Sequence, residues 1–379
     1  MSDDLAAKLL GQDFADQVRV EDSERLETQM EASKWNPADI TDALNGLRPP
    51  PPQLLKRSDG KNLLYQGKIH WFQGEPGSMK SMLAQHAVQQ VLMDPEGGPC
   101  LYIDYESEGT DVVGRLIDLG VPRDVIAERF DYVHPEGGTT MSPGDLAAYN
   151  RLVSSRPWSL VVLDGTTDSI AFEGLEANSG GDIARWLQAI PRKLQATGAT
   201  VVVIDHVAKS TEGRGRWAIG SGHKLAGLDG VSFTLEMIVP LAKAVDKPEH
   251  TGVAKVVVNK DRGGDVQALC GDDNRTVGML RITAYQDGTL DARVEDDTTS
   301  VAMDVAYEVF VAVGRALKTY PGATGKQVIN STGLSEYEAS AGLLQMVERG
   351  WVKAEAAGAS FKHTLTQAGV REFRDDQPF

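Results

Sequence analysis

A glycine-rich loop between an apolar run and a helical stretch constrains this chain more than any other feature of its sequence. In order, its residues are Gly74, Glu75, Pro76, Gly77, Ser78, Met79, Lys80 and Ser81. Residues 68–73 before the loop form a predicted strand, and residues 81–92 after it form a predicted helix. A strand, a glycine-rich turn, Lys-Ser and a helix in this order are the context of a Walker A phosphate loop.

The chemistry of such a loop predicts ATP and Mg²⁺ as ligands. Its backbone N–H groups surround the β- and γ-phosphates, and the N-terminus of the following helix adds partial positive charge. We expect Lys80 to lie against phosphate oxygens and the Ser81 hydroxyl to hold Mg²⁺. Met79 departs from the motif, which has glycine there. We expect this side chain to need a negative φ and room beside the nucleotide. The alternative is an ordinary strand-to-helix turn with a solvated lysine.

Apolar, β-branched runs alternate with helical stretches over residues 60–300. The predicted strands are residues 68–73, 100–104, 160–164, 200–205, 231–238 and 253–259, and the helices between the first four include residues 81–92 and 182–196. This alternation predicts an α/β core with a mostly parallel sheet covered on both faces. Ligands of such sheets bind outside the carboxyl ends of the strands, and each candidate residue below follows a predicted strand. Residues 279–285 and 289–294 predict a hairpin around Asp287-Gly288.

Composition shifts divide the chain into three predicted regions. Residues 1–52 form a helical N-terminal arm that ends in a proline-rich linker, because Pro49 to Pro52 favour an extended spacer. Residues 53–298 form the α/β core. Residues 299–379 show three helices, a hairpin and a helix, which is the order of a winged helix-turn-helix. Two roles stay open for this last region, weak duplex binding and protein docking or packing.

Carboxylates follow the second and third predicted strands of the core. Asp104, Glu106 and Glu108 lie at the end of the second strand, and each is a candidate to accept a proton from an attacking water. Asp164 ends the apolar run of residues 160–164, which has the Walker B form. We expect it to hold Mg²⁺ through a water. The alternative is that Asp164 is the polar residue that ends a buried strand.

His206 ends the fourth predicted strand and is a candidate to contact the γ-phosphate or the attacking water. A histidine with only structural hydrogen bonds is the alternative. Residues 208–224 follow directly and carry four cations and one aromatic residue, namely Lys209, Arg214, Arg216, Lys224 and Trp217. Flexible cations with an aromatic ring are suited to single-stranded DNA, through phosphate attraction and base stacking. A plain surface loop is the competing interpretation.

Lys260 and Arg262 are two cations at the end of a predicted strand. Alternate residues of a strand share a face, so we expect both side chains to point the same way. In a ring or filament they would reach the γ-phosphate bound by a neighbouring subunit. The alternative is a solvated pair of charges.

Net charge limits the kind of DNA binding that is possible. The chain has 38 Lys and Arg against 54 Asp and Glu, a formal net charge of −16. This disfavours nonspecific coating of DNA but leaves room for a local basic loop, so we expect DNA binding to be modest, salt-sensitive and dependent on assembly. No apolar run approaches the roughly 20 residues of a membrane helix, and the N-terminus is acidic. We therefore expect a cytoplasmic protein without membrane contact.

Together, the phosphate loop, the carboxylates, His206 and the K-x-R pair resemble the RecA/DnaB superfamily of P-loop ATPases. The likeness is to RepA-like hexameric replicative helicases and phage-encoded AAA-type ATPases, and it covers about residues 60–295. It implies a RecA-like core that hydrolyses Mg-ATP at subunit interfaces. It further implies Glu106 as catalytic glutamate, His206 as γ-phosphate sensor, and Lys260 with Arg262 as fingers acting in trans. The segment after Asp164 and residues 208–224 correspond to the DNA-binding loops.

The resemblance predicts an ATP-hydrolysing motor or remodeller of single-stranded DNA in replication or recombination, encoded by a phage or plasmid. Its expected partners are single-stranded DNA, further copies of the chain in a hexameric ring or a filament, and other replication or recombination proteins. Two alternatives remain. One is a RecA-like recombinase or recombination mediator that forms filaments, and the other is a non-motor, ATP-binding regulator that docks on DNA.

Overall fold

The computed structural model describes residues 39–139, 142–206, 227–244, 248–271, 273–296, 307–334, 336–357 and 360–373. The chain divides into two compact units, Met1–Pro50 and Pro51–Phe379. In the first unit the described helix is the exposed α3 (Thr41–Leu44), and residues 47–53 after it carry no regular secondary structure. The other helices predicted for the N-terminal arm fall on residues 1–38, outside the described residues. The two predicted boundaries between the three regions stay predictions.

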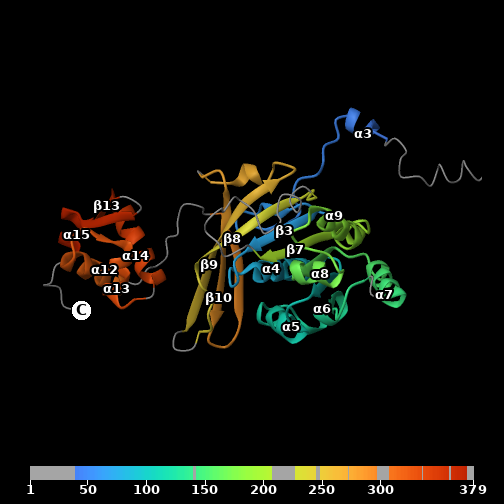
Figure 1. Ribbon diagram of the computed structural model, residues 1–379, viewed down its shortest axis with the longest axis horizontal. Helices are drawn as coiled ribbons and strands as arrows, with labels where there is room; N and C mark the ends of the chain where they lie inside the picture. The colour runs from blue at the N-terminus through green and yellow to red at the C-terminus, as the bar shows by residue number, and fades with distance from the viewer. Residues whose placement is uncertain are drawn as a thin grey trace, which may run out of the picture. The chain divides into compact units, whose positions relative to one another are not determined.

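A mixed sheet forms the centre of the α/β core (Figure 1). Its order among the described residues is β11-β10-β9-β8-β3-β7-β6-β4-β5. In chain order these strands are β3 (Ile69–Gly74), β4 (Cys100–Asp104), β5 (Phe130–Val133), β6 (Leu160–Asp164), β7 (Thr200–His206), β8 (Val231–Val239), β9 (Glu249–Asp261), β10 (Thr276–Tyr285) and β11 (Leu290–Glu295).

The strands from β8 to β5 in this order run parallel, while β9, β10 and β11 add antiparallel pairs. The predicted α/β fold with a mostly parallel sheet is therefore confirmed. The hairpin of β10 and β11 also forms, with Gly288 at a φ of 90° in its turn. Strand β9 is six residues longer than the predicted strand and runs antiparallel to its neighbours. Strand β5 was not predicted from the sequence.

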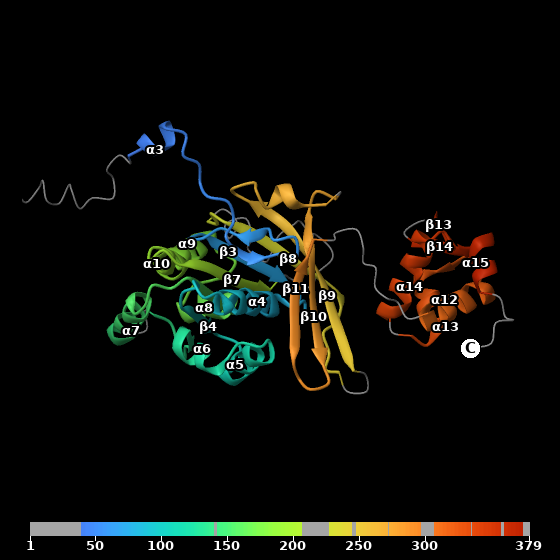
Figure 2. The ribbon, with the colours of Figure 1, turned by 180° about the vertical axis from the view of Figure 1, so that it is seen from behind.

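Helices cover both faces of the sheet (Figure 2). On one face lie α4 (Lys80–Met93), α5 (Gly109–Asp118) and α6 (Arg123–Arg129), and on the other lie α7 (Pro143–Ser154), α8 (Thr166–Phe172), α9 (Gly180–Ala189) and α10 (Pro191–Gln195). Alternate residues of one strand enter the two cores. Leu160 and Val162 belong to the core on the α4 side, while Val161 and Leu163 belong to the core on the side of α7 to α10. Pro191 begins α10 and so divides the helix predicted for residues 182–196.

A small hairpin of β1 (Leu54–Lys56) and β2 (Asn62–Leu64) precedes the central sheet. The buried Arg57 guanidinium donates to the carbonyl oxygens of Leu269 and Val277 and pairs with Asp59. These bonds fasten the hairpin to the segment between β9 and β10 and to β10 itself.

The C-terminal region has a core of its own. Its elements are α12 (Tyr307–Thr319), β12 (Ala323–Thr324), α13 (Gly325–Thr332), α14 (Glu336–Glu348), β13 (Val352–Ala357), β14 (Ser360–Leu365) and α15 (Gln367–Glu372). Phe310, Trp351 and Phe373 meet edge to face within it. The predicted helices and hairpin are present, and β12 extends the hairpin to a three-stranded antiparallel sheet. The winged helix-turn-helix interpretation stays a prediction. None of the described helices is long and apolar enough to cross a membrane.

Candidate nucleotide-binding site

The phosphate loop lies between the end of β3 at Gly74 and the start of α4 at Lys80. A Cβ atom on Gly74 would come within 2.7 Å of the Leu235 carbonyl oxygen, so this position has no room for a side chain. Gly77 has a φ of 79°, in the left-handed region that glycine adopts freely. The Ser78 N–H closes the turn by donating to the Glu75 carbonyl oxygen at 3.1 Å.

Met79 also takes a left-handed conformation, with φ 67° and ψ 25°. The expected negative φ is therefore wrong. The residue is the N-cap of α4, and its carbonyl oxygen accepts the first helical hydrogen bond, from the Leu83 N–H. Because the loop must turn sharply into α4 here, the left-handed form is imposed on methionine, at about 1–2 kcal/mol. The side chain is 6% exposed and packs in the core under α4, which offsets this strain.

Lys80, the first residue of α4, is 5% exposed. Its Nζ atom donates to the Glu75 carbonyl oxygen at 3.0 Å and lies 3.4 Å from Nδ1 of His206. Burial lowers the pKa of Lys80, while the carboxylates of Asp164, Glu106 and Asp205 act in the opposite direction. The ammonium group is thus held between the loop and the end of β7.

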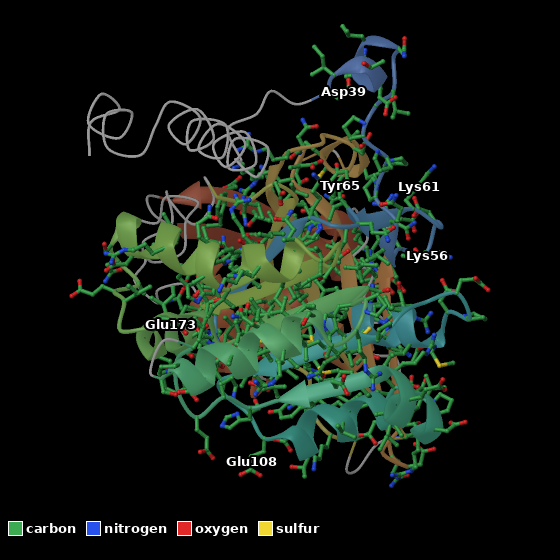
Figure 3. All side chains as sticks on the ribbon, turned by 90° about the vertical axis from the view of Figure 1, so that its right-hand side faces the viewer. Asp39, Lys56, Lys61, Tyr65, Glu108 and Glu173 are labelled. Atoms are coloured by element: carbon green, nitrogen blue, oxygen red, sulfur yellow. The ribbon has the colours of Figure 1, made fainter. Side chains whose placement is uncertain are left out.

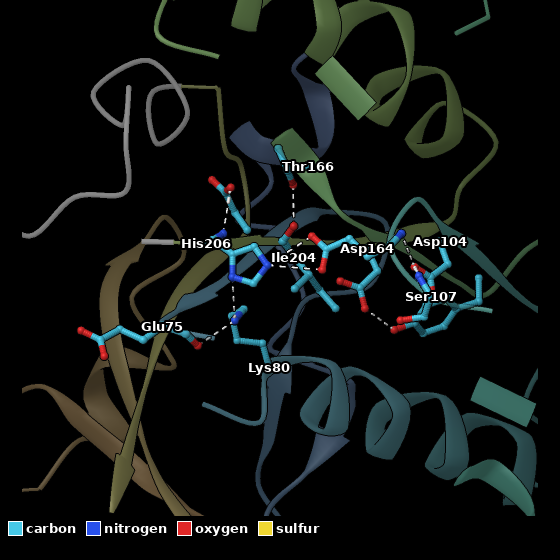
Figure 4. Close-up of polar contacts among 11 residues, drawn as sticks. Glu75, Lys80, Asp104, Ser107, Asp164, Thr166, Ile204 and His206 are labelled. Carbon is cyan, nitrogen blue, oxygen red and sulfur yellow. Dashed lines mark hydrogen bonds and ion pairs between the residues drawn. The ribbon is translucent and has the colours of Figure 1, made fainter. Parts of the chain in front are cut away.

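His206 connects Lys80 to Glu106 (Figure 4). Its Nε2 atom lies 3.2 and 3.3 Å from the two carboxylate oxygens of Glu106. An ammonium group only donates, so Nδ1 accepts from Lys80 and the ring proton sits on Nε2, which donates to Glu106. This hydrogen bond lowers the pKa of Glu106, and the nearby Lys80 charge adds to the effect. Glu106 is consequently ionised and able to accept a proton.

The three candidate carboxylates after β4 have different surroundings. Asp104 is 1% exposed, and its Oδ1 atom accepts hydrogen bonds from the Glu106 and Ser107 N–H groups, both at 2.9 Å. Glu108 is the exposed N-cap of α5 (Figure 3). Of the three, Glu106 is the residue whose carboxylate contacts His206.

Asp164 ends β6 and is 6% exposed. Its Oδ2 atom accepts from the Tyr102 hydroxyl at 2.7 Å. Burial raises the pKa of Asp164, while the Tyr102 and Ser81 hydroxyls act to lower the pKa of this carboxylate. Mg²⁺ takes one or two protein carboxylates and completes its shell with phosphate and water, so Ser81 and Asp164 fit this ion. Oδ2 of Asp104, buried without a hydrogen-bond partner among the described residues, is a further acceptor beside them.

Three residues of the site were not predicted from the sequence. Gly165 follows Asp164 with a φ of 88°, and a Cβ atom there would lie 3.0 Å from Cγ of Glu106. Thr166 donates through its hydroxyl to the Ile204 carbonyl oxygen at 2.6 Å, which ties α8 to β7. Tyr102 orients Asp164. The Asp-Gly step after an apolar strand was the available signal for Gly165, whereas the contacts of Thr166 and Tyr102 depend on the folded sheet.

Lys260 and Arg262 follow a strand end, as predicted, but this end lies at the other edge of the sheet from the phosphate loop. Strand β9 is antiparallel to β8, and its last residue, Asp261, pairs with Val231 at the start of β8. The phosphate loop instead begins level with Leu235. Strand β9 ends one residue before Arg262, so the strand alternation does not include this residue. The two charges are still near each other, because Arg262 contributes, after burial, to lowering the pKa of Lys260.

The predicted DNA-binding residues Lys209, Arg214, Arg216, Trp217 and Lys224 all lie outside the described residues. A cavity of about 780 Å³ is lined by β1, by the C-terminal end of α4 and by β11, and includes Lys56, Gln90 and Arg293. None of the candidate site residues lines it.

Residues 29–212 match the family model described as the AAA domain. The matched segment contains the phosphate loop, Glu106, Asp164 and His206, so this part of the chain is similar to a nucleotide-binding family and holds the candidate residues of a P-loop site. Among solved structures, a KaiC-like protein from the hyperthermophilic archaeon Pyrococcus horikoshii is similar, at 12% identity and a TM-score of 0.43. The alignment covers 64% of this chain and 99% of that one. No curated protein matches the chain by sequence.

We predict that Glu106→Gln lowers ATP turnover by about 10²–10⁴-fold, because the amide keeps the size of the side chain but loses its basicity. ATP binding should persist, since Glu106 is not part of the phosphate loop. Glu108→Gln is the matched control and should leave turnover unchanged. A steady-state ATPase assay combined with nucleotide titration measures both quantities. Equal losses in the two variants would remove Glu106 from the catalytic role.

A second prediction concerns the left-handed backbone at Met79. Both Met79→Ala and Met79→Gly remove the buried side chain, but only glycine relieves the strain. We expect the glycine variant to be more stable than the alanine variant by about 1 kcal/mol. Chemical unfolding of the two variants measures the difference. A more stable alanine variant would contradict the positive φ at this position.

Proposed function

We propose that this P-loop ATPase is a motor or remodeller of single-stranded DNA that acts as a homo-oligomer, in the manner of DnaB- and RepA-like helicases in phage or plasmid replication. The observation that carries the ATPase part is the continuous contact from Lys80 through His206 to Glu106 at the end of the phosphate loop. The assembly part rests on the position of Arg262.

In ATP hydrolysis at this site, each of these side chains has a distinct role. The loop N–H groups and Lys80 bind the β- and γ-phosphates, and bound Mg²⁺ would neutralise their charge. Glu106 accepts the proton of the attacking water, and His206 orients the Glu106 carboxylate. A γ-phosphate oxygen competes with Nδ1 of His206 for the Lys80 ammonium group, which lies 3.4 Å away. Loss of that contact gives His206 a way to report that ATP is bound.

Arg262 is too far from the phosphate loop of its own chain to contact the same nucleotide. Its N–H donates to the Gly230 carbonyl oxygen, and the Gly230 N–H donates to the carbonyl oxygen of Ile69, the first residue of β3. From Ile69 to the loop is about 16 Å along the strand. An arginine supplied in trans raises the rate of phosphoryl transfer by about 10³–10⁵-fold. A head-to-tail ring or filament would bring Arg262 to the site of the next subunit.

Single-stranded DNA is proposed as the substrate from the cations and Trp217 of residues 208–224, which follow His206 directly. Because the net charge is −16, one subunit offers little attraction for DNA, and an oligomer would sum the contributions of these segments.

We further propose that the C-terminal region is a winged helix used mainly for protein docking. Helix α14, in the place of a recognition helix, contains no lysine or arginine. Lys353 on the hairpin is paired with Glu355 at 2.7 Å, which leaves less charge for DNA phosphates. Exposed Leu344 and Phe361 on α14 and β14 suit a protein surface better than a duplex.

Electron microscopy with ATP and single-stranded DNA separates the proposed motor from its alternatives. Closed rings support the motor, helical filaments support a recombinase or recombination mediator, and single subunits that bind both ligands support a regulator.

We predict that single-stranded DNA stimulates ATP turnover and that the stimulation weakens steeply between about 50 and 200 mM salt, because counterion release opposes binding. Duplex DNA of the same sequence is the control. ATP turnover with no response to either DNA would contradict the DNA part of the proposal while leaving the ATPase intact.

We predict that Lys80→Ala and Arg262→Ala each abolish turnover for different reasons. Lys80→Ala should lose nucleotide binding, whereas Arg262→Ala should retain it. In an equal mixture, about one site in four pairs an intact phosphate loop with an intact finger, so roughly a quarter of wild-type turnover should return. Arg293→Ala, which removes an exposed arginine paired with Asp291, is the control. Full turnover by the Arg262 variant would refute action in trans.

A further inference from the structure

Asp261, the residue before Arg262, organises the segment that follows β9. Its Oδ1 atom accepts hydrogen bonds from the Tyr65 hydroxyl at 2.9 Å and from the Gly263 N–H at 3.1 Å. Its Oδ2 atom accepts from the N–H groups of Val266 and Gln267, both at 2.9 Å. One carboxylate therefore fixes the backbone on the C-terminal side of Arg262 over the five residues from Gly263 to Gln267.

Tyr65 is the side chain that holds this carboxylate from outside the segment. It lies between β2 and β3, 196 positions before Asp261, and is 7% exposed. Its hydroxyl also accepts from the Asp265 N–H at 3.1 Å. Burial raises the pKa of Tyr65, as does the Asp261 carboxylate, so the hydroxyl remains a donor. A Cβ atom on Gly263 would collide with the Tyr65 ring, which shows how closely the segment passes over it.

The other side of Arg262 is supported through the same tyrosine. The buried His70 accepts from the Val231 N–H through Nδ1 at 3.1 Å, and its Nε2 atom lies 2.9 Å from the Tyr65 carbonyl oxygen. The two rings stack at 6.3 Å with an interplanar angle of 6°. Gly230 passes so close to His70 that a Cβ atom would come within 2.6 Å of its ring. These contacts fix Gly230 and Val231 at the start of β8. The Gly230 carbonyl oxygen in turn accepts the hydrogen bond from the Arg262 N–H.

Arg262 makes hydrogen bonds through its backbone N–H and its Nε atom. Its N–H donates to the Gly230 carbonyl oxygen at 3.2 Å, and Nε donates to the Leu228 carbonyl oxygen at 3.3 Å. Within the described parts of the chain, Nη1 and Nη2 make no hydrogen bond, and the residue is exposed. A guanidinium group held at Nε keeps its two terminal nitrogens for a bidentate contact with phosphate oxygens.

We propose that Tyr65 is a positioning residue for Arg262: its hydroxyl, through Asp261, holds the arginine in the orientation needed to reach the nucleotide of a neighbouring subunit. The inference rests on the proposed action of Arg262 in trans. The hydrogen bonds and the ring contact given above for Tyr65 go to Asp261, Asp265 and His70, and none of these is a residue of the phosphate site. A displacement of about 1 Å in a catalytic group costs up to about 10²-fold in rate, which sets the expected size of the effect.

Tyr65→Phe tests this role because it removes one oxygen atom and keeps the ring that stacks on His70. We expect kcat for ATP to fall by about 10–100-fold with KM and ATP affinity unchanged, because the phosphate loop is intact. Adding Arg262→Ala to Tyr65→Phe should lower kcat no further than Arg262→Ala alone, since both changes disable one group.

Mixed oligomers then separate positioning from a general structural role. In an equal mixture of Tyr65→Phe and Lys80→Ala subunits, about one site in four pairs an intact phosphate loop with a well-held Arg262, so turnover should recover to roughly a quarter of wild type. A defect inside the variant's own site would give no such recovery. The double variant Tyr65→Phe/Lys80→Ala, mixed with Lys80→Ala, should stay inactive and is the control.

Wild-type kcat in Tyr65→Phe, or no recovery in the mixture, would overturn the inference. If Tyr65→Phe does not fold, as judged by its thermal unfolding, Asp261→Asn serves in its place and should give the same recovery. Loss of turnover in Arg262→Ala together with full turnover in Tyr65→Phe refutes the positioning role alone. Full turnover in both variants refutes the trans action on which it rests.

Discussion

The parallel pairing of β3 with β7 and of β4 with β6 is the constraint on which the site depends. It places Gly74 opposite His206 and Asp104 opposite Asp164. Groups that are 60 positions apart, for Asp104 and Asp164, and 132 positions apart, for Gly74 and His206, thereby meet at one edge of the sheet. Lys80 can then contact His206, His206 can contact Glu106, and Ser81 can contact Asp164. The helices on both faces exclude water from these strands and keep them in register. The distances between Lys80, His206 and Glu106 therefore stay short.

The direction of the last strands decides how the protein can use Arg262. Because β9 returns antiparallel to β8, its carboxyl end lies beside the amino end of β3. The phosphate loop and Arg262 therefore occupy opposite edges of one sheet. In the proposed assembly, a single subunit would supply half of a trans site at each edge, and repeated head-to-tail contacts would complete one site per interface. Under that proposal, the Tyr65 and Asp261 network, which fixes the segment after β9, belongs to the half that contains Arg262.

Local sequence predicted the elements and the phosphate edge well, since those depend on hydrophobic periodicity and on residues adjacent in the chain. The strands before the phosphate loop and before Asp104, Asp164 and His206 all appear within one or two residues of their predicted bounds. Contacts between residues far apart in the chain could not be predicted from local sequence. The antiparallel course of β9 is set by its pairing with β8, and nothing in residues 253–259 encodes a direction. The prediction for Met79 was wrong for another reason. The residue type predicted a negative φ, but closure of the loop into α4 imposes the left-handed conformation.

A structure of the assembled protein with Mg²⁺ and a non-hydrolysable ATP analogue tests the central claim most directly. The distance to measure joins the Arg262 guanidinium of one subunit to the γ-phosphate held at Lys80 of the next. We predict a hydrogen-bond distance, with Glu106 of the nucleotide-binding subunit facing the same phosphate. A nucleotide enclosed only by residues of a single chain, with Arg262 in solvent, would contradict a site shared between subunits.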